Sequence, residues 1–309
     1  MEYRFLGNTS LQISRIGFGC WAMGGHGWGQ VSDRESINAV KTALDCGINF
    51  FDTADVYGFG HSEEILGKAL GSRRHDVVIA TKFGVSWDEA ANIGRNCSAV
   101  YIMKAVEASL KRLNIDYIPL YQIHWPDPKT PLEETMRALQ KCREQGKIKY
   151  IGCSNFSDKN LLEAMAYADI VSIQLPYSFI RREIEDEMVP LSVENKIGVL
   201  VYDTLARGLL SGKYGLDTKF GVNDSRNRDS NFMGQKFKDN LLLVEKLRAI
   251  GEKYGKYPAH VAVRWVLDNT LVTCAIIGMK TEQQVKDNML SINWKLSKDD
   301  LQILAKREV

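Results

Sequence analysis

Short runs of apolar residues alternate along the chain with longer stretches of helical periodicity. The short runs are rich in Val, Ile and Phe and lack strict alternation with polar residues, which indicates strands buried on both faces, as in a parallel sheet. The pattern predicts strands at Ile16–Gly19, Ile48–Asp52, Val77–Lys82, Tyr117–His124, Ile148–Cys153, Val171–Leu175, Val199–Tyr202 and Thr273–Gly278.

The helical stretches carry start signals. A capping box places Ser or Thr at the helix start and Glu or Gln three residues later, so that backbone N–H groups of the first turn find acceptors. Ser32–Glu35, Thr130–Glu133 and Thr281–Gln284 fit this pattern. Pro131 would be the first helical residue of the second, a position that suits proline.

Eight strand–helix units in series predict an α/β fold, a (β/α)8 TIM barrel, although an open doubly wound sheet would show the same alternation. Tyr3–Ile13, with a turn at Gly7-Asn8, is expected to form an N-terminal β-hairpin that closes the barrel floor. The long loop after strand 7, Ser211–Gly234, is typical of a lid. With no linker or repeat, residues 1–309 are expected to form one domain.

Composition excludes several classes of protein. The chain has 45% apolar and 25% charged residues, the balance of a globular protein rather than a disordered one. Its 40 basic and 38 acidic residues give no case for binding nucleic acid or a membrane. The N-terminus lacks a signal peptide and no run is long enough to span a bilayer, so we expect a cytoplasmic protein. The oligomeric state is left open.

The cysteine pattern argues against disulfides and against a structural metal. Six cysteines are present without a C-x-x-C pair, and several lie in apolar runs. We expect reduced, packed thiols and no metal site.

Polar residues recur where the predicted strands end, and chemistry in such barrels lies at the carboxyl ends of the strands. Strand two ends in Asp52, strand three in Lys82 and strand four in His124, and Tyr57 follows Asp52 closely enough to reach the same mouth. A free phenol has a pKa of about 10, and a nearby ammonium lowers it. A neutral histidine can donate to a carbonyl oxygen. The four residues therefore fit a proton donor and oxyanion stabiliser for a carbonyl that takes up hydride.

One glycine pattern invites a different interpretation. Gly17-Phe18-Gly19-Cys20-Trp21-Ala22 matches the loose dinucleotide-binding fingerprint, which must open a helix. The residues that follow, Met23-Gly24-Gly25, cannot start one. This argues against a Rossmann site and for a loop after strand one.

Four blocks resemble the aldo-keto reductase family: Asp52-Thr53-Ala54-x-x-Tyr57-Gly58, Thr81-Lys82, Ile123-His124-Trp125, and Gly152-Cys153-Ser154-Asn155-Phe156. They occur in the family's order over nearly the whole chain. The block from Tyr202 to Tyr214 resembles the longer bacterial members, including inositol-utilisation-type and general-stress-type reductases.

The resemblance implies an NADPH-dependent oxidoreductase that reduces aldehydes and ketones to alcohols. Tyr57 would be the general acid, Lys82 with Asp52 would tune it, and His124 would orient the carbonyl. Ser154, Asn155 and Gln174 would hold the nicotinamide carboxamide and Tyr202 would stack on the ring. Further cofactor contacts are implied for Gly19, Trp21, Asp203, Leu205, Arg207, Gly208 and Leu210.

The adenosine end of the cofactor is assigned to the last strand–helix junction. A helix N-terminus with a lysine suits a phosphate. Gly278, Lys280 and Thr281 would hold the 2′-phosphate, and Gln284 and Asn288 would face adenine. Because relatives differ around Lys280, NADPH is expected while NADH remains possible but weaker.

Two departures lie near the cofactor. Asp203-Thr204 replaces the usual Ser-Pro and could alter contacts there. Arg226 and Arg228 in the long loop could clamp the pyrophosphate or be solvated.

Substrate choice is open at this stage. Trp21, Trp87 and Trp125 are expected to line an aromatic rim, with His26, Trp28, Gln30 and Asp127 as further loop candidates. The alternatives are a physiological sugar or polyol dehydrogenase, which uses the same groups in reverse, and a cofactor-binding regulatory subunit with weak turnover.

Overall fold

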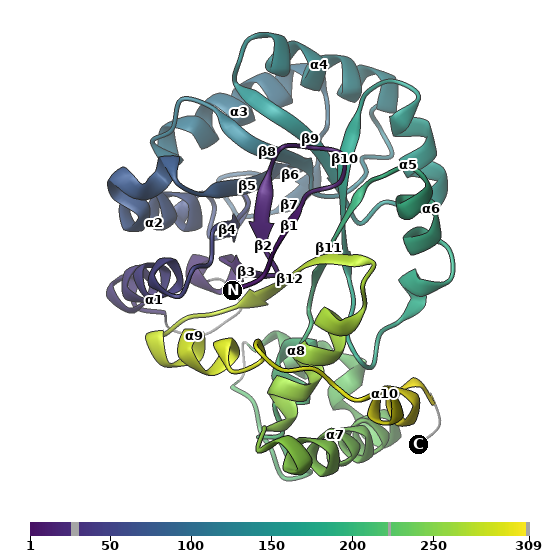
Figure 1. Ribbon diagram of the computed structural model, residues 1–309. Helices are drawn as coiled ribbons and strands as arrows, with labels where there is room; N and C mark the ends of the chain where they lie inside the picture. Colours follow the sequence, from purple (N-terminus) through teal and green to yellow (C-terminus); the bar gives the residue numbers. More distant parts are fainter. Residues whose placement is uncertain (26–30, 222–223, 307–309) are drawn as a thin grey trace.

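Eight parallel strands close into a barrel in the computed structural model, which describes residues 1–25, 31–221 and 224–306 (Figure 1). Strand β12 pairs with β3, so the sheet has no free edge, and this excludes the open doubly wound alternative. The observed strand ends lie within two residues of the predicted ones. In order around the barrel the strands are β3 (Ile16–Gly19), β4 (Phe50–Asp52), β5 (Val78–Phe83), β8 (Ile118–Ile123), β9 (Ile148–Ser154), β10 (Ile170–Pro176), β11 (Gly198–Tyr202) and β12 (Val272–Gly278).

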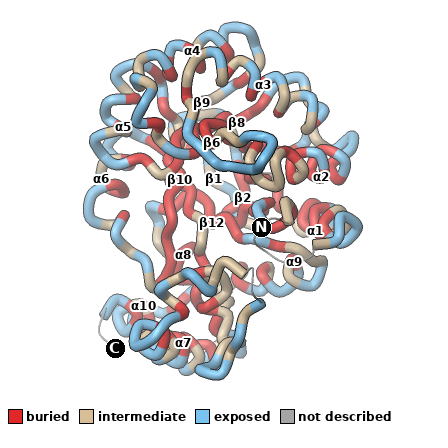
Figure 2. The backbone as a smooth tube through the Cα atoms, turned by 180° about the vertical axis from the view of Figure 1, so that it is seen from behind, coloured by how far each residue is buried: buried red, intermediate tan, exposed pale blue. Residues whose placement is uncertain are grey.

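Helices surround the strands on the outside (Figure 1). Their inward faces and the strands are buried, and their outward faces are exposed (Figure 2). This two-layer arrangement turns all strand carboxyl ends to one rim. The helices are α1 (Asp33–Asp45), α2 (His61–Leu70), α3 (Ala99–Leu113), α4 (Leu132–Glu144), α5 (Asp158–Met165), α6 (Met188–Glu194), α7 (Gly234–Tyr254), α8 (Pro258–Asp268), α9 (Glu282–Met289) and α10 (Lys298–Ala305).

The N-terminal hairpin closes the barrel floor, as predicted. Strands β1 (Tyr3–Phe5) and β2 (Gln12–Ser14) pair antiparallel, and Leu6 beside them is fully buried among side chains of the barrel interior. Gly7 has φ +53°, and a Cβ there would lie 2.5 Å from the carbonyl oxygen of Val171. Only glycine allows this close approach of turn and barrel.

A second antiparallel hairpin was not predicted from the sequence. It consists of β6 (Val85–Trp87) and β7 (Ile93–Arg95) and lies between β5 and α3. All three residues of β7 are exposed, and the hairpin is one of the pale blue loops in Figure 2. Because it directly continues the strand that carries Lys82, it extends the rim of the barrel mouth.

The long loop after β11 contains short 3-10 turns at Ser225–Arg228 and Ser230–Phe232. Tyr214, Phe220 and Phe232 pack edge-to-face, with ring centroids 5.2–5.8 Å apart. The described part of this segment therefore has an aromatic core of its own. Its role as a lid stays a prediction.

Two of the three predicted capping residues act at a helix start. Ser32 accepts from the Glu35 N–H at α1, and Thr281 accepts from the Gln284 N–H at α9. The prediction for Thr130 is wrong, because Pro131 is the N-cap of α4 and lies just outside the helix.

The reason for this difference is a competing acceptor. The Thr130 hydroxyl donates to Asp127 Oδ2 at 2.7 Å, so it is held in the preceding loop instead of capping the helix.

Three further findings concern the residues that the structure describes. None of their helices has the length and apolarity needed to cross a membrane. They contain no group of three or more His, Cys, Asp or Glu arranged to hold a metal ion. All six cysteines are free thiols, and all except Cys46 are buried.

Candidate active site

Three predicted residues lie at neighbouring strand ends on one rim of the barrel. Asp52 is the last residue of β4, Lys82 is near the end of β5, and His124 follows β8 directly. Tyr57 lies in the loop between β4 and α2, where its ring is edge-on to His124 with centroids 5.6 Å apart. The structure thus brings the four residues together.

A buried ion pair fixes the lysine. Lys82 is fully buried and Asp52 is 3% exposed, and Lys82 Nζ donates to Asp52 Oδ1 at 2.6 Å and to the Thr53 carbonyl at 2.9 Å. The same ammonium lies 3.3 Å from the Tyr57 hydroxyl oxygen. These contacts place the Lys82 ammonium between the Asp52 carboxylate and the Tyr57 hydroxyl.

Burial and charge act in opposite directions on the tyrosine. Burial of the hydroxyl raises the pKa of Tyr57, and the Lys82 ammonium lowers it only in part, so the pKa is above its ordinary value. The lysine effect has the sign expected from the sequence, but the net direction is the opposite. Burial also lowers the pKa of Lys82, but Asp52 and Tyr57 outweigh it, so the net pKa is raised and the ammonium stays charged.

His124 is neutral at physiological pH. Burial, followed by the charges of Lys82 and Arg95, lowers its pKa well below the ordinary value. Its Nδ1 is buried and has no hydrogen-bond partner among the described residues. A neutral imidazole beside a phenol can donate to or accept from a ligand oxygen without adding charge to the site.

The loop that carries Tyr57 is locked to the loop after β3. Gly58 has φ +63°, and a Cβ there would lie 2.4 Å from the Gly24 carbonyl oxygen. The rings of Trp21 and Tyr57 stack with centroids 6.2 Å apart. The backbone contact and the ring contact together set the position of the phenol.

We expect Gly58→Ala to misplace Tyr57 and to destabilise the fold by roughly 2–4 kcal/mol, since the left-handed backbone and the close contact both penalise a Cβ. Urea unfolding and kcat/KM for a carbonyl substrate would measure the two effects. Gly146→Ala is the matched control, because Gly146 has φ +72° and no atom within 4 Å of a Cβ. Equal losses in both variants would contradict a specific role of the contact.

A group of hydrogen-bonded polar side chains lies beside His124. Asn155 Nδ2 donates to the His124 carbonyl at 2.9 Å and to Ser154 Oγ at 3.1 Å, and Asn155 Oδ1 accepts from the Tyr202 hydroxyl at 2.7 Å. Three residues predicted to bind the nicotinamide are therefore joined in one hydrogen-bonded group. Burial raises the pKa of Tyr202 to about 12, so it stays a donor.

Two glutamines complete the surroundings of the aspartate. Gln174 Nε2 donates to Asp52 Oδ2 at 2.7 Å, and Gln122 Nε2 approaches the same oxygen at 3.4 Å. Sequence analysis placed Gln174 at the cofactor and missed Gln122. The available signal was its position two residues before His124, which in a strand puts both side chains on one face.

The turn after β11 has an unusual backbone. Asp203 Oδ1 accepts from the Arg207 N–H at 2.8 Å, and both residues have positive φ. The Arg207 guanidinium lies 3.4 Å from Asp229 and 6.0 Å from the centre of the Trp21 ring. The other predicted cofactor residues of this block are in the same turn: Leu205, Gly208 and Leu210.

The last predicted block lies between β12 and α9. The Lys280 N–H donates to Gln284 Oε1 at 2.7 Å, which closes the turn that begins at the exposed Gly278. Thr281 caps the helix, as described above. Gln284 is half-buried and Asn288 is buried, so the helix offers only part of this polar set to a ligand.

Basic residues gather at this junction. Burial, followed by the charges of Arg226 and Lys213, lowers the pKa of Lys280. Arg226 pairs with Asp224 at 2.5 Å and also donates to the Tyr214 hydroxyl. Lys280, Arg226 and Lys213 outnumber the two carboxylates that act on Lys280, Asp224 and Glu35, and the remaining positive charge suits a phosphate. Arg228, by contrast, is exposed.

Comparison with known proteins agrees with this geometry. The profile of the Aldo/keto reductase family matches residues 15–308. The chain belongs to the aldo-keto reductase family. It is therefore an oxidoreductase of a family that uses nicotinamide cofactors, and its resemblance to the bacterial members is confirmed.

Three relatives illustrate the range of this family. Aldo-keto reductase YhdN of Bacillus subtilis is 41% identical over 97% of this chain and 91% of its own. The NADH-specific methylglyoxal reductase of Escherichia coli is 33% identical over 97% and 96%. The solved structure of glycerol dehydrogenase AKR11B4 from Gluconobacter oxydans superimposes with a TM-score of 0.92 at 37% identity, covering 98% of this chain and 94% of that one.

Aromatic side chains surround the mouth of this aldo-keto reductase. Trp21 and Trp125 are 41% and 38% exposed, and Trp87 packs on Phe59 with centroids 5.7 Å apart. Asp127 accepts from the Lys129 N–H and the Thr130 hydroxyl of its own loop and from the Cys97 N–H before α3. The other loop candidates lie outside the described residues: His26, Trp28 and Gln30.

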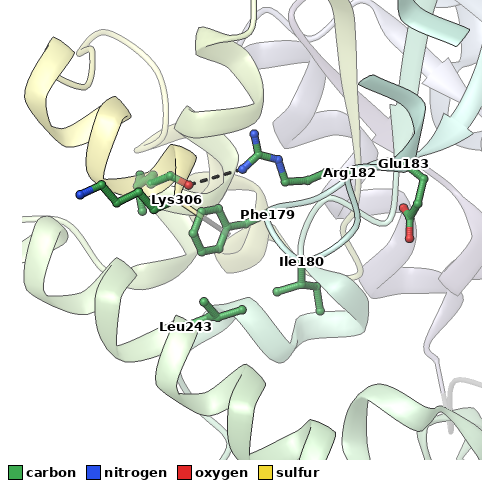
Figure 3. A pocket seen from close by; sticks show the side chains of 7 residues that line it. Phe179, Ile180, Arg182, Glu183, Leu243 and Lys306 are labelled. Atoms are coloured by element: carbon green, nitrogen blue, oxygen red, sulfur yellow. Dashed lines mark hydrogen bonds between the residues drawn. The ribbon is translucent and has the colours of Figure 1, made fainter. Parts of the chain in front are cut away.

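A separate cavity of about 220 Å³ lies away from the acid–base residues (Figure 3). Phe179, Ile180 and Leu243 form its apolar part, and Arg182 on its wall donates to the Leu304 carbonyl. None of the four residues at the barrel mouth lines it, so it is not part of the candidate active site.

Proposed function

We propose that this protein is an NADPH-dependent reductase that converts aldehydes and ketones to alcohols, with Tyr57 as the general acid. The supporting observation is the Lys82 ammonium held between the Asp52 carboxylate and the Tyr57 hydroxyl, next to a neutral histidine. This arrangement matches what a carbonyl oxygen needs while it gains negative charge.

Each residue has a separate task in this proposal. The nicotinamide, when bound, supplies the hydride. The Tyr57 hydroxyl gives its proton to the carbonyl oxygen, and its raised pKa keeps that proton in place until charge develops. Lys82 stabilises the phenolate that remains, and Asp52 keeps the lysine charged and oriented. His124 positions the carbonyl oxygen by a neutral hydrogen bond.

The residues present fit a dinucleotide with an added phosphate. The Ser154–Asn155–Tyr202 group would hold the nicotinamide end, with Gln174 below it, and the turn from Asp203 to Leu210 would hold the middle. Lys280, with Arg226 and Lys213 near it, supplies the positive charge for the 2′-phosphate. These assignments, with Gly19 and Trp21 in the loop after β3, complete the proposed cofactor site.

We expect Lys280→Met to weaken NADPH binding more than NADH binding, by roughly 1–3 kcal/mol, because a charged hydrogen bond to the 2′-phosphate would be lost. Fluorescence titration with both cofactors would measure the difference. Lys286→Met is the control, since Lys286 lies in α9, the helix that follows Lys280, and pairs with Glu282. Equal weakening of both cofactors would contradict the assignment of Lys280 to the 2′-phosphate.

A second candidate function is the reverse reaction, oxidation of a polyol. The similarity to a glycerol dehydrogenase favours it, and the same four residues would serve, with Tyr57 accepting the proton. Comparing NADP⁺-dependent oxidation of glycerol with carbonyl reduction under the same conditions distinguishes the two directions.

The deciding experiment follows NADPH absorbance with 4-nitrobenzaldehyde as a generic carbonyl. Turnover above about 1 s⁻¹, within the common range of enzymes, supports the reductase. Binding of NADPH without turnover of aldehydes or polyols would instead support a regulatory subunit. Absence of NADPH binding would contradict the cofactor assignment.

A further inference from the structure

Arg95 occupies a fixed place at the rim of the barrel mouth. Arg95 is the last residue of β7 and pairs with Val85 in β6. Val85 in turn lies three residues after Lys82 in the chain. The next residue, Asn96, donates its N–H to the Gly84 carbonyl at 3.1 Å. The hairpin backbone therefore holds Arg95 close to the end of the strand that carries the catalytic lysine.

The side chain of Arg95 is oriented by an aromatic ring. Its guanidinium carbon lies 4.9 Å from the centre of the Trp125 ring, and Trp125 directly follows His124. The charge of Arg95 is close enough to contribute to the lowered pKa of His124. Stacking on a tryptophan restricts the guanidinium plane, so less freedom is lost when a ligand binds to it.

No carboxylate neutralises this guanidinium among the described residues, since Arg95 forms no ion pair there. Asp127 is the carboxylate whose charge acts on the pKa of Arg95, and both of its oxygens already accept hydrogen bonds from other groups. Oδ2 accepts from the Cys97 N–H and the Thr130 hydroxyl, and Oδ1 accepts from the Lys129 N–H. The guanidinium of Arg95 therefore keeps its positive charge at the rim, over the Trp125 ring and close enough to His124 to affect its pKa.

We propose that Arg95 binds an anionic group of the substrate, and that the preferred substrates are aldehydes or ketones carrying a carboxylate or a phosphate. This inference rests on the proposed carbonyl reduction. A guanidinium offers parallel N–H donors that match the oxygens of either anion. The substrate body would lie against the aromatic rim, with its carbonyl at Tyr57 and His124 and its charge at Arg95.

A purely structural role of Arg95 predicts a different experimental result. If Arg95 only supported Trp125, replacing it would change the turnover of charged and neutral substrates in proportion. The ratio of kcat/KM between an anionic substrate and its neutral analogue therefore isolates the proposed contact. High salt should reduce this ratio, because the pair lies partly in solvent.

The experiment compares 4-carboxybenzaldehyde with its methyl ester in the wild type and in Arg95→Gln. We expect the wild type to prefer the acid by roughly five- to fifty-fold in kcat/KM, mostly through KM, and the variant to lose this preference. Arg73→Gln is the control with the same loss of charge, since Arg73 is exposed and pairs with Asp45 far along the surface. Glyceraldehyde and its 3-phosphate form the second pair, which distinguishes phosphate from carboxylate.

Failure of this inference is distinguishable from failure of the proposed function. Equal kcat/KM within both pairs in the wild type would overturn the role of Arg95 while leaving the reductase intact. A preference that survives in Arg95→Gln would also overturn it. Binding of 4-(hydroxymethyl)benzoate, followed by tryptophan fluorescence, reads the anion site without turnover. Arg95-dependent binding without any reduction would support the site and contradict the proposed reaction.

Discussion

Tyr57→Phe is expected to lower kcat for carbonyl reduction by roughly 10²- to 10⁴-fold while leaving cofactor affinity unchanged. The substitution removes only the hydroxyl group, and the proton of that group is needed in the transition state rather than for binding. The phenyl ring keeps its stacking on Trp21 and its edge contact with His124, so the pocket retains its shape. Stopped-flow or steady-state measurement of NADPH oxidation, beside a fluorescence titration of NADPH, tests both parts.

Tyr117→Phe is the matched control for this substitution. Tyr117 is 48% exposed and precedes β8, so the loss of its hydroxyl should not affect turnover. A Tyr57→Phe protein that keeps wild-type kcat would remove the assignment of the general acid. A protein that loses NADPH binding instead would show that Tyr57 holds the cofactor.

Lys82→Met is expected to have two effects of different origin. Among the described side chains it leaves the buried Asp52 carboxylate with the amides of Gln122 and Gln174 as partners, which should lower the free energy of unfolding by roughly 3–5 kcal/mol. It also removes the charge that lowers the pKa of Tyr57 and stabilises its phenolate, so kcat should fall by roughly 10²- to 10⁴-fold. Urea unfolding and NADPH oxidation measure the two quantities.

The double variant Asp52→Asn/Lys82→Met separates these effects. Replacing the carboxylate by an amide removes the unpaired charge, so much of the lost stability should return while turnover stays low. If the single variant unfolds like the wild type, the ion pair does not stabilise the fold as its burial implies. If the double variant recovers turnover, Lys82 is not required for proton transfer.

The barrel could be predicted from the sequence because its signals are local and repeat. Each strand is a short apolar run, and the proposed catalytic residues stand at the ends of such runs, as Asp52, Lys82 and His124 show. The rule that chemistry gathers at one rim then joins residues far apart in sequence. The hairpin β6–β7 was missed because its strands have three residues each and no apolar periodicity.

Other features of the site depend on burial and on contacts between distant residues. The raised pKa of Tyr57 results from loss of water around its hydroxyl, which no spacing reveals. The stacking of Arg95 on Trp125 joins two loops that the sequence gives no reason to pair. Thr130 shows the same limit locally, since a nearby aspartate took the hydroxyl that the helix start was expected to use.

The N-terminal hairpin determines the side of the barrel from which ligands can enter and leave. Leu6 and Ile13 fill the lower end of the barrel, and the Gly7 turn seals it against the ends of two strands. Every molecule that reaches Tyr57 must therefore arrive and depart through the upper opening. A dinucleotide laid across that opening would narrow the passage that the smaller molecule needs. If the cofactor binds there as proposed, we expect it to arrive before the smaller molecule and to leave after it.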